Sequence, residues 1–158
     1  TSKQYLEIID KLRKKVPNIA LSSDFIVGFP GETKKDFQDT LNLVKEVKFA
    51  QSYSFKYSRR IGTKANRINC MLTEEEKNER LQVLQMVLNK QKHDYNKTFL
   101  GKRIEVFIKG KGKKDNQYKG TTKWMQSTIF ESKKHLETNK VNLKVKSAMD
   151  NCLLGDLI

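Results

Sequence analysis

Hydrophobic residues near the start of the chain recur at helical spacing. They fall on one face over residues 2–16, and Thr1 with Gln4 matches the capping-box pattern that begins helices. Pro17 ends this predicted helix, because proline disfavours a helical conformation in the residue before it. Residues 19–27 form a short, mostly apolar run with β-branched and aromatic side chains at its end, which predicts a buried strand.

The same succession of helix and strand patterns repeats further along the chain. Glycine and proline mark a turn at residues 28–31, after which Thr33 can cap a helix with an apolar stripe. Residues 51–57 alternate aromatic with polar side chains and predict a second strand, which a polar loop follows. Thr73 then begins a long helix that we expect to continue to about Phe99.

This order of elements sets the fold expected for the first part of the chain. Helices that alternate with strands favour a parallel sheet with crossover helices, so residues 1–98 are predicted to be an α/β unit of two strands and three helices. Two strands make an incomplete sheet, with open edges and little area for a core. We therefore expect the chain to be a fragment, with residues 1–98 forming the C-terminal portion of a larger α/β domain.

The pattern changes after Gly101, where short strand-like segments replace helices. Strand patterns are expected in residues 104–108, 120–130, 141–146 and 152–158. Short strands separated by polar turns indicate a small all-β barrel or sandwich over residues 99–158. We place the domain boundary near residue 98.

Composition narrows the class of protein. No apolar run approaches the length of a transmembrane helix, and 37% hydrophobic with 32% charged residues fits a folded, polar chain. Cys70 and Cys152 are too few for a disulfide scaffold, which favours a cytoplasmic protein. With His93 and His135 they make no metal-binding spacing, so we expect no metal ligands and assign all four to structural or surface positions.

The net charge of +14 is unevenly distributed along the chain. Residues 1–94 carry 18 basic and 12 acidic side chains, whereas residues 95–158 carry 14 basic and 6 acidic ones. A strongly basic C-terminal segment indicates a polyanionic partner, with nucleic acid first. A lysine-rich genome bias is the alternative explanation, because lysine far outnumbers arginine.

The most informative stretch runs from Asp24 to Glu32. It places the turn of residues 28–31, Gly-Phe-Pro-Gly, at the end of a buried strand and directly before a helix. Ligands bind at such positions in α/β folds, because loops and helix N-termini converge there and glycine lets a ligand approach the backbone. A plain strand-to-helix turn is the alternative, and the lysine of a phosphate-binding P-loop is missing.

Three segments together resemble a known family. Residues 24–33 (Asp-Phe-Ile-Val-Gly-Phe-Pro-Gly-Glu-Thr), residues 54–58 (Ser-Phe-Lys-Tyr-Ser) and the terminal β module carry the resemblance. The chain resembles the C-terminal part of a radical-SAM tRNA methylthiotransferase of the MiaB type, followed by a TRAM domain. Residues 58–65 depart from the family's Ser-Pro-Arg-Pro-Gly-Thr-Pro-Ala, because all three prolines are absent while Arg60 is kept.

The resemblance implies a fold and a cofactor site for residues 1–98. They would form the C-terminal part of a partial β/α barrel, with S-adenosylmethionine across the carboxyl ends of its strands. The residues that it assigns to the cofactor are Ser23, Asp24, Ile26, Gly28 and Phe55. It also implies two 4Fe-4S clusters in the complete enzyme, whose cysteine ligands are absent from this chain, so no catalytic residue is expected here.

The C-terminal module resembles a TRAM domain, a small OB-like barrel that binds RNA. A flexible cationic loop with aromatic side chains nearby combines charge with stacking surface. The RNA-binding residues expected are Arg60, Lys109, Lys111, Lys113, Lys114, Lys119, Lys123 and Trp124. A solvated hairpin loop is the alternative.

By this resemblance the complete enzyme methylthiolates C2 of an isopentenylated adenosine beside the anticodon. This chain would supply part of the S-adenosylmethionine site and hold the anticodon stem-loop of tRNA. Alone, we expect it to be inactive, monomeric and not associated with membranes. Two alternatives stay open: a non-catalytic RNA-binding protein, and a methylthiotransferase that acts on a ribosomal protein or on another tRNA adenosine.

Overall fold

The computed structural model describes residues 1–68, 72–136 and 138–158, which form a mixed α/β chain. The chain divides into two compact units, Thr1–Gln91 and Lys92–Ile158. The division lies within the long helix α3 (Glu74–Lys97), so the last turns of this helix belong to the second unit. Each unit is described by itself, and Cys70 lies outside the described residues.

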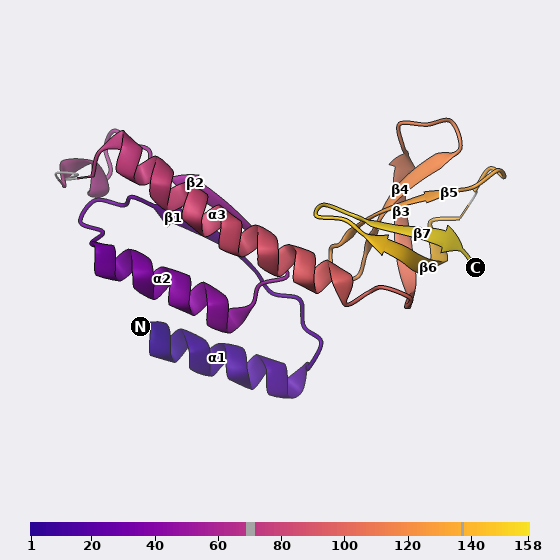
Figure 1. The fold of residues 1–158 in the computed structure, drawn as a ribbon, viewed down its shortest axis with the longest axis horizontal. Coiled ribbons are helices and arrows are strands. Elements are labelled where there is room, and N and C mark those ends of the chain that lie inside the picture. The colour runs from indigo at the N-terminus through magenta and orange to yellow at the C-terminus, as the bar shows by residue number, and fades with distance from the viewer. Residues whose placement is uncertain (69–71, 137) are drawn as a thin grey trace. The chain divides into compact units, whose positions relative to one another are not determined.

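The first unit contains a small parallel sheet covered by helices (Figure 1). Its elements are α1 (Ser2–Lys15), β1 (Ser22–Val27), α2 (Lys34–Val47), β2 (Gln51–Lys56), a 3₁₀ turn (Ala65–Arg67) and most of α3. β1 and β2 pair in parallel, which confirms the expected crossover topology. β1 begins at Ser22, three residues after the start that the apolar run predicts.

Helix caps fix where the first unit's helices begin. The hydroxyls of Thr1 and Thr33 each accept a hydrogen bond from the backbone N–H three residues on, and both capping boxes are complete. Thr73 caps α3 in the same way, with Glu76 reaching back to the Thr73 N–H over 2.9 Å. All three predicted helix starts are therefore confirmed.

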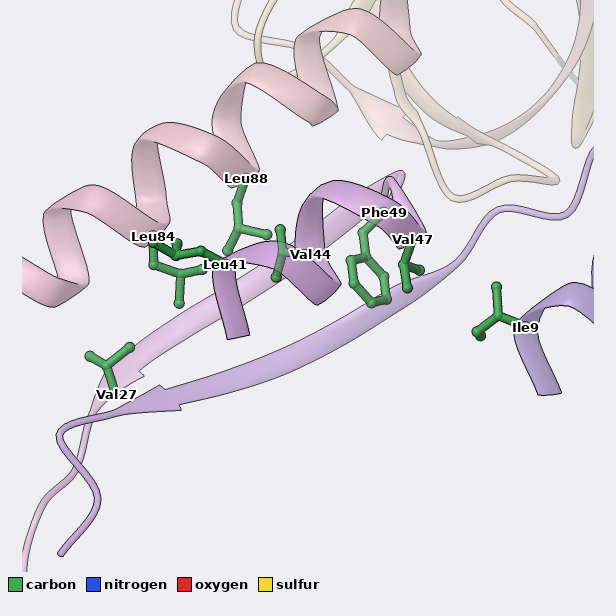
Figure 2. Packing of buried hydrophobic residues seen from close by; sticks show 8 residues of the cluster. All are labelled: Ile9, Val27, Leu41, Val44, Val47, Phe49, Leu84 and Leu88. Atoms are coloured by element: carbon green, nitrogen blue, oxygen red, sulfur yellow. The ribbon is translucent and has the colours of Figure 1, made fainter. Parts of the chain in front are cut away.

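The core of the first unit lies on one face of the sheet. Figure 2 shows Leu84 and Leu88 of α3 extending toward Leu41 and Val44 of α2, with Val27 of β1 nearby. These side chains are at most 6% exposed. Burying a leucine or valine side chain contributes about 1.5–3 kcal/mol to the free energy of unfolding, so each of these residues stabilises the unit. The opposite face of the sheet carries no helix in the described residues.

The Gln91 side chain of α3 links the C-terminal end of α2 to the segment that leads into β2. Its amide Nε2 donates to the carbonyl oxygen of Val44 over 2.7 Å, and its Oε1 accepts from the N–H of Phe49 over 3.1 Å. Arg13 of α1 donates to the carbonyl oxygen of Val47. These bonds link α1 and α3 to the C-terminal end of α2 and to the segment that follows it.

The second unit is a closed five-stranded barrel, which decides between the barrel and the sandwich expected from the sequence. Its strands are β3 (Arg103–Lys111), β4 (Gln117–Thr122), β5 (Ser127–Glu131), β6 (Lys140–Ala148) and β7 (Leu153–Leu157). Their order around the barrel is β3-β4-β5-β7-β6, and only β5 with β7 is parallel among these pairs. In the part of the chain that the structure describes, each strand of the barrel pairs with a neighbour on both sides, so closure removes the free edges of an open sheet.

The expected strand region of residues 120–130 is in fact two strands, β4 and β5. A turn separates them, with Met125 at a φ of 66°. Gly120 lies where β3 leaves no room for a side chain on β4, since a Cβ there would lie 2.4 Å from Cγ1 of Val106 and 2.7 Å from the carbonyl oxygen of Phe107. Only glycine fits such a close approach of strands.

The last turns of α3 pack onto the barrel. Asn96, which is 2% exposed, donates from Nδ2 to the carbonyl oxygen of Met149 over 2.9 Å. Tyr95 and Phe99 meet edge to face beside the barrel core. Among the described residues, no helix has the length and apolar content needed to cross a membrane.

A candidate ligand pocket and a candidate RNA-binding surface

A pocket of about 600 Å³ lies at the carboxyl ends of β1 and β2. Its walls are Ile26, Phe29, Phe55, Lys56, Tyr57, Ser58, Arg60, Thr63 and Ala65. Because the two strands are parallel and in register, both carboxyl ends open at the same edge of the sheet. This is the position at which open α/β folds bind ligands.

Strand alternation divides the expected cofactor residues between two faces of the sheet. Ile26 and Phe55 are register partners on the helix-free face and are 57% and 53% exposed, and Asp24 lies on the same face. Ser23 lies on the opposite face, with Phe25. The structure thus brings Ile26 and Phe55 together at the pocket and separates Ser23 from them.

Gly28, the fifth expected cofactor residue, begins the loop beside the pocket. It has a φ of +70°, and a Cβ there would lie 2.6 Å from Cγ of Lys77 on α3. Glycine is therefore required by both the backbone conformation and the close approach of α3. Phe29, the next residue, meets the ring of Tyr57 edge to face at 5.1 Å and forms a wall of the pocket.

The carboxylate of Glu32 links this loop to α3, because it accepts from the backbone N–H groups of Gly28 and Phe29 and from Arg80. Its Oε2 accepts from the N–H of Gly28 over 2.8 Å, and its Oε1 accepts from Nη1 of Arg80 on α3 over 2.5 Å. Arg80 also donates to the carbonyl oxygen of Glu32, and its guanidinium lies 5.4 Å from the ring centre of Phe37. The Arg80 and Glu32 side chains are only 9% and 13% exposed.

Sequence reasoning did not find this ion pair. The two residues are 48 positions apart, and neither belongs to a local motif that requires the other. In the sequence, Glu32 is marked only by its place directly after the Gly-Phe-Pro-Gly turn. The pairing follows from the packing of α3 against the loop, which no periodicity in the sequence encodes.

Arg60, expected to bind RNA, is located in the first unit. It lines the pocket together with Ile26 and Phe55. The other expected RNA-binding residues belong to the second unit. The pocket therefore offers a guanidinium beside apolar and aromatic walls, an arrangement suited to a ligand that carries both a ring and a carboxylate or phosphate.

The β3–β4 hairpin displays the central lysines of the expected RNA-binding set. Its turn is closed by the N–H of Gly112, which donates to the carbonyl oxygen of Gln117 over 2.6 Å. The Gln117 side chain accepts from the N–H of Lys113 over 3.1 Å, which shapes the tip. Lys109, Lys111, Lys113, Lys114 and Lys119 are all exposed on this hairpin.

Lys123 and Trp124 lie in the turn between β4 and β5, away from that tip in sequence. The Lys123 ammonium lies 4.6 Å from the centre of the Trp124 ring, and the same ring is 5.2 Å from Phe99. The indole is half-buried and packs against the barrel core. Part of the stacking surface that we expected from Trp124 is thus used within the barrel itself.

The remaining histidines and cysteine do not gather into a site. In the part of the chain that the structure describes, no three His, Cys, Asp or Glu side chains come together as metal ligands. His93 Nδ1 is 2.9 Å from Asp150, and His135 is exposed. Burial raises the pKa of the Cys152 thiol, which keeps it in its less reactive protonated form.

These features define a class: a small α/β unit with a ligand pocket at its strand ends, joined in one chain to a basic β-barrel. No family model matches the chain. Curated proteins called tRNA-2-methylthio-N(6)-dimethylallyladenosine synthase are similar to it over nearly its whole length. The protein of Wolbachia pipientis wMel is 48% identical over 98% of the chain, and that of Ehrlichia ruminantium (strain Gardel) is 45% identical over 98%.

The synthase of Agrobacterium fabrum is 38% identical over 99% of the chain. The chain spans about a third of these relatives' own length, 36% of the Wolbachia protein and 34% of the Agrobacterium one, and matches their C-terminal part. The chain is therefore homologous to the C-terminal part of the tRNA-2-methylthio-N(6)-dimethylallyladenosine synthases.

Proposed function

We propose that this chain is the C-terminal part of a radical-SAM tRNA methylthiotransferase that modifies C2 of an isopentenylated adenosine beside the anticodon. The observation that carries the proposal is the 38–48% identity to synthases of that name over almost the entire chain. The similarity includes both units, so it favours the enzyme over a free-standing RNA-binding barrel. It also favours tRNA over a ribosomal protein as the substrate.

The first unit supplies part of the S-adenosylmethionine site in this proposal. The pocket at the strand ends fits that molecule, because Ile26, Phe29 and Phe55 offer apolar and aromatic walls for an adenine ring. The Arg60 guanidinium is suited to the carboxylate of the methionine portion. When bound, S-adenosylmethionine supplies the radical chemistry and the methyl group.

The described residues do not supply the ligands of an iron–sulfur cluster. No group of three potential ligands exists there, so the residues present do not fit a 4Fe-4S cluster. The role proposed for the first unit is therefore to bind and orient the nucleoside, with no step of the reaction assigned to its side chains.

The second unit holds tRNA in this proposal, as an OB-like barrel of the TRAM type. Five exposed lysines along one hairpin provide the electrostatic attraction for a phosphate backbone. Contacts of this kind position an RNA without reading its bases. Selection of the isopentenylated adenosine is left to the active site of the complete enzyme.

A titration of the 158-residue chain with S-adenosylmethionine, followed by NMR, tests the proposed pocket. The expected result is a saturable shift of the Ile26 methyl and the Phe55 ring signals, because both face the pocket. Ile104, which is buried in the barrel, provides the matched control signal and should not move.

Shifts confined to other residues, or none at millimolar ligand, would remove the pocket from the proposal. An Arg60→Gln variant should weaken binding of S-adenosylmethionine more than binding of adenosine, because only the former carries a carboxylate. Equal weakening for both ligands would contradict the role given to Arg60.

A further inference from the structure

The loop after β5 lies against the β3–β4 hairpin, although the two are separate in the sequence. The N–H of Ser132 donates to the carbonyl oxygen of Asn116 over 2.9 Å. In the ladder next to it, Gln117 of β4 is the register partner of Glu131 of β5. A backbone hydrogen bond thus joins the β3–β4 hairpin to the loop after β5. Residues 133–134, both lysines, follow this bond in the loop and lie beside the hairpin.

The first residues of this loop hydrogen-bond to one another. The Ser132 hydroxyl donates to the carbonyl oxygen of Lys134 over 2.8 Å and accepts from the Lys134 N–H over 3.3 Å. Leu136 packs against the barrel core, and the carbonyl oxygen of Asn139 accepts from the N–H of Ile108 over 2.9 Å. These contacts fix the backbone of residues 132–134 next to the hairpin.

The two connections together concentrate positive charge. Their exposed lysines are Lys111, Lys113, Lys114, Lys133 and Lys134. Within the described ranges none of the five forms an ion pair with a carboxylate, whereas Lys140 and Lys146 of the neighbouring β6 pair with Glu105 and Asp156. Five lysines against the single carboxylate of Asp115 leave these two connections with a net positive charge, which favours a polyanionic partner.

We propose that Lys133 and Lys134 form one continuous phosphate-binding surface with the lysines of the hairpin, and that this surface holds the sugar-phosphate backbone of an RNA stem-loop. The inference rests on the RNA-binding role proposed for the barrel and adds a second loop to it. Lysine is a point charge without the planar fork that reads base edges. Residues 111–117 and 132–136 also contain no Phe, Tyr or Trp for base stacking.

Fluorescence anisotropy with a labelled tRNA anticodon stem-loop, at several KCl concentrations, tests the surface. The variants to compare are Lys133→Gln/Lys134→Gln on the loop and Lys113→Gln/Lys114→Gln on the hairpin. Each lost phosphate contact should reduce the slope of log affinity against log salt by about 1, so each double variant should lose up to about 2. Affinity at low salt should fall about tenfold.

The matched control is Lys11→Gln/Lys15→Gln on α1, which removes the same charge from the first unit. Its salt slope should equal that of the unaltered chain. Thermal unfolding should be unchanged in all three variants, because these side chains are exposed. A slope change as large in the control would show that net charge, and not this surface, governs binding, and would overturn the inference.

The outcomes separate the inference from the proposed function. If the stem-loop binds and the hairpin variant weakens it while Lys133→Gln/Lys134→Gln does not, the added loop is wrong and the RNA-binding role stands. If the unaltered chain does not bind the stem-loop, both the added loop and the RNA-binding role of the barrel are contradicted. Titration of the stem-loop into a fixed concentration of protein, well above Kd, should reach its end point at one RNA per chain. An end point at two RNAs per chain would contradict a continuous surface.

Discussion

Glu32 couples the loop before α2 to α3 through a single carboxylate. One of its oxygens accepts from Gly28 and the other from Arg80, and both ionic side chains are almost fully buried. Removing one member of such a pair leaves an uncompensated charge, which costs more than the pair itself contributes. This makes the pair testable by free-energy measurements on the chain alone.

Arg80→Met should lower the free energy of unfolding by about 3 kcal/mol, because the Glu32 carboxylate loses its partner. Adding Glu32→Gln to that variant should recover part of the loss, since the stranded charge is then gone. Urea unfolding followed by circular dichroism measures both. Asp39→Asn, which breaks the exposed pair with Lys35, is the control and should not shift the midpoint.

If the double variant is as unstable as the sum of its two single variants, Glu32 and Arg80 act independently. The pair would then not be the device that shapes the loop. The hydrogen bonds from Arg80 to the carbonyl oxygens of Glu32 and Thr33, and its contact with the Phe37 ring, would then explain any loss in the single variant.

Thr33 and Asp36 provide a second test at this scale. The Thr33 hydroxyl, and then its backbone N–H, hold the pKa of the Asp36 carboxyl below its ordinary value. A lowered pKa means that this contribution to stability is present above the unfolded-state pKa and is lost as the pH falls through the folded-state pKa.

Thr33→Ala should therefore raise the pKa of Asp36 toward its ordinary value, as measured by NMR titration of the carboxyl carbon. Thr33→Ser keeps the hydroxyl and should leave that pKa low. Identical values in all three proteins would show that the capping box does not form in solution.

At the scale of elements, the barrel depends on the close approach of β3 and β4 at Gly120. Gly120→Ala places a methyl group 2.4 Å from Val106 and 2.7 Å from a backbone oxygen, so the strands must separate. The expected loss is about 2 kcal/mol or more of unfolding free energy. Trp124, the single tryptophan of the chain, reports on this unit by fluorescence.

Thr121→Ala is the matched control, because Thr121 adjoins Gly120 and is only half-buried. It should cost much less than Gly120→Ala. A Gly120→Ala protein as stable as the unaltered chain would mean that the strands accommodate a side chain there, contrary to the packing seen in the barrel.

The elements of the first unit were predictable because their signals are local. These signals are the capping boxes at Thr1, Thr33 and Thr73 and the apolar stripe of α2. Each of them involves only residues that are close together in the sequence. The barrel was predictable only as a class. Its parallel β5–β7 pair and the split of residues 120–130 at Met125 depend on closure over long sequence distances.

In the candidate site too, some residues could be expected from the sequence, whereas others are brought together only by tertiary packing. Ile26 and Phe55, which the family resemblance assigns to the cofactor, lie together at the pocket, whereas Ser23 faces the other way because strand residues alternate. Contacts made by tertiary packing left no sequence signal. Arg80 with Glu32 is one such contact, and the backbone bond that brings residues 133–134 beside the hairpin is another.

At the scale of the whole molecule, the larger share of the excess charge lies in a different unit from the pocket. Residues 95–158 carry 14 basic and 6 acidic side chains, and most of the expected RNA-binding lysines lie there. The pocket lies within Thr1–Gln91. A chain built this way fits a protein that binds a small molecule with one unit and a polyanion with the other.

That this chain is the C-terminal part of a tRNA methylthiotransferase is tested most directly by a chimera. The corresponding C-terminal part of the Wolbachia pipientis relative is replaced by these 158 residues, and the protein is supplied with S-adenosylmethionine, a one-electron reductant and tRNA carrying isopentenylated adenosine. Mass spectrometry of the nucleosides should detect the methylthiolated product, and Ile26→Asp in the pocket should abolish it. A folded chimera that holds both clusters and S-adenosylmethionine yet leaves the isopentenylated adenosine unchanged would contradict the assignment.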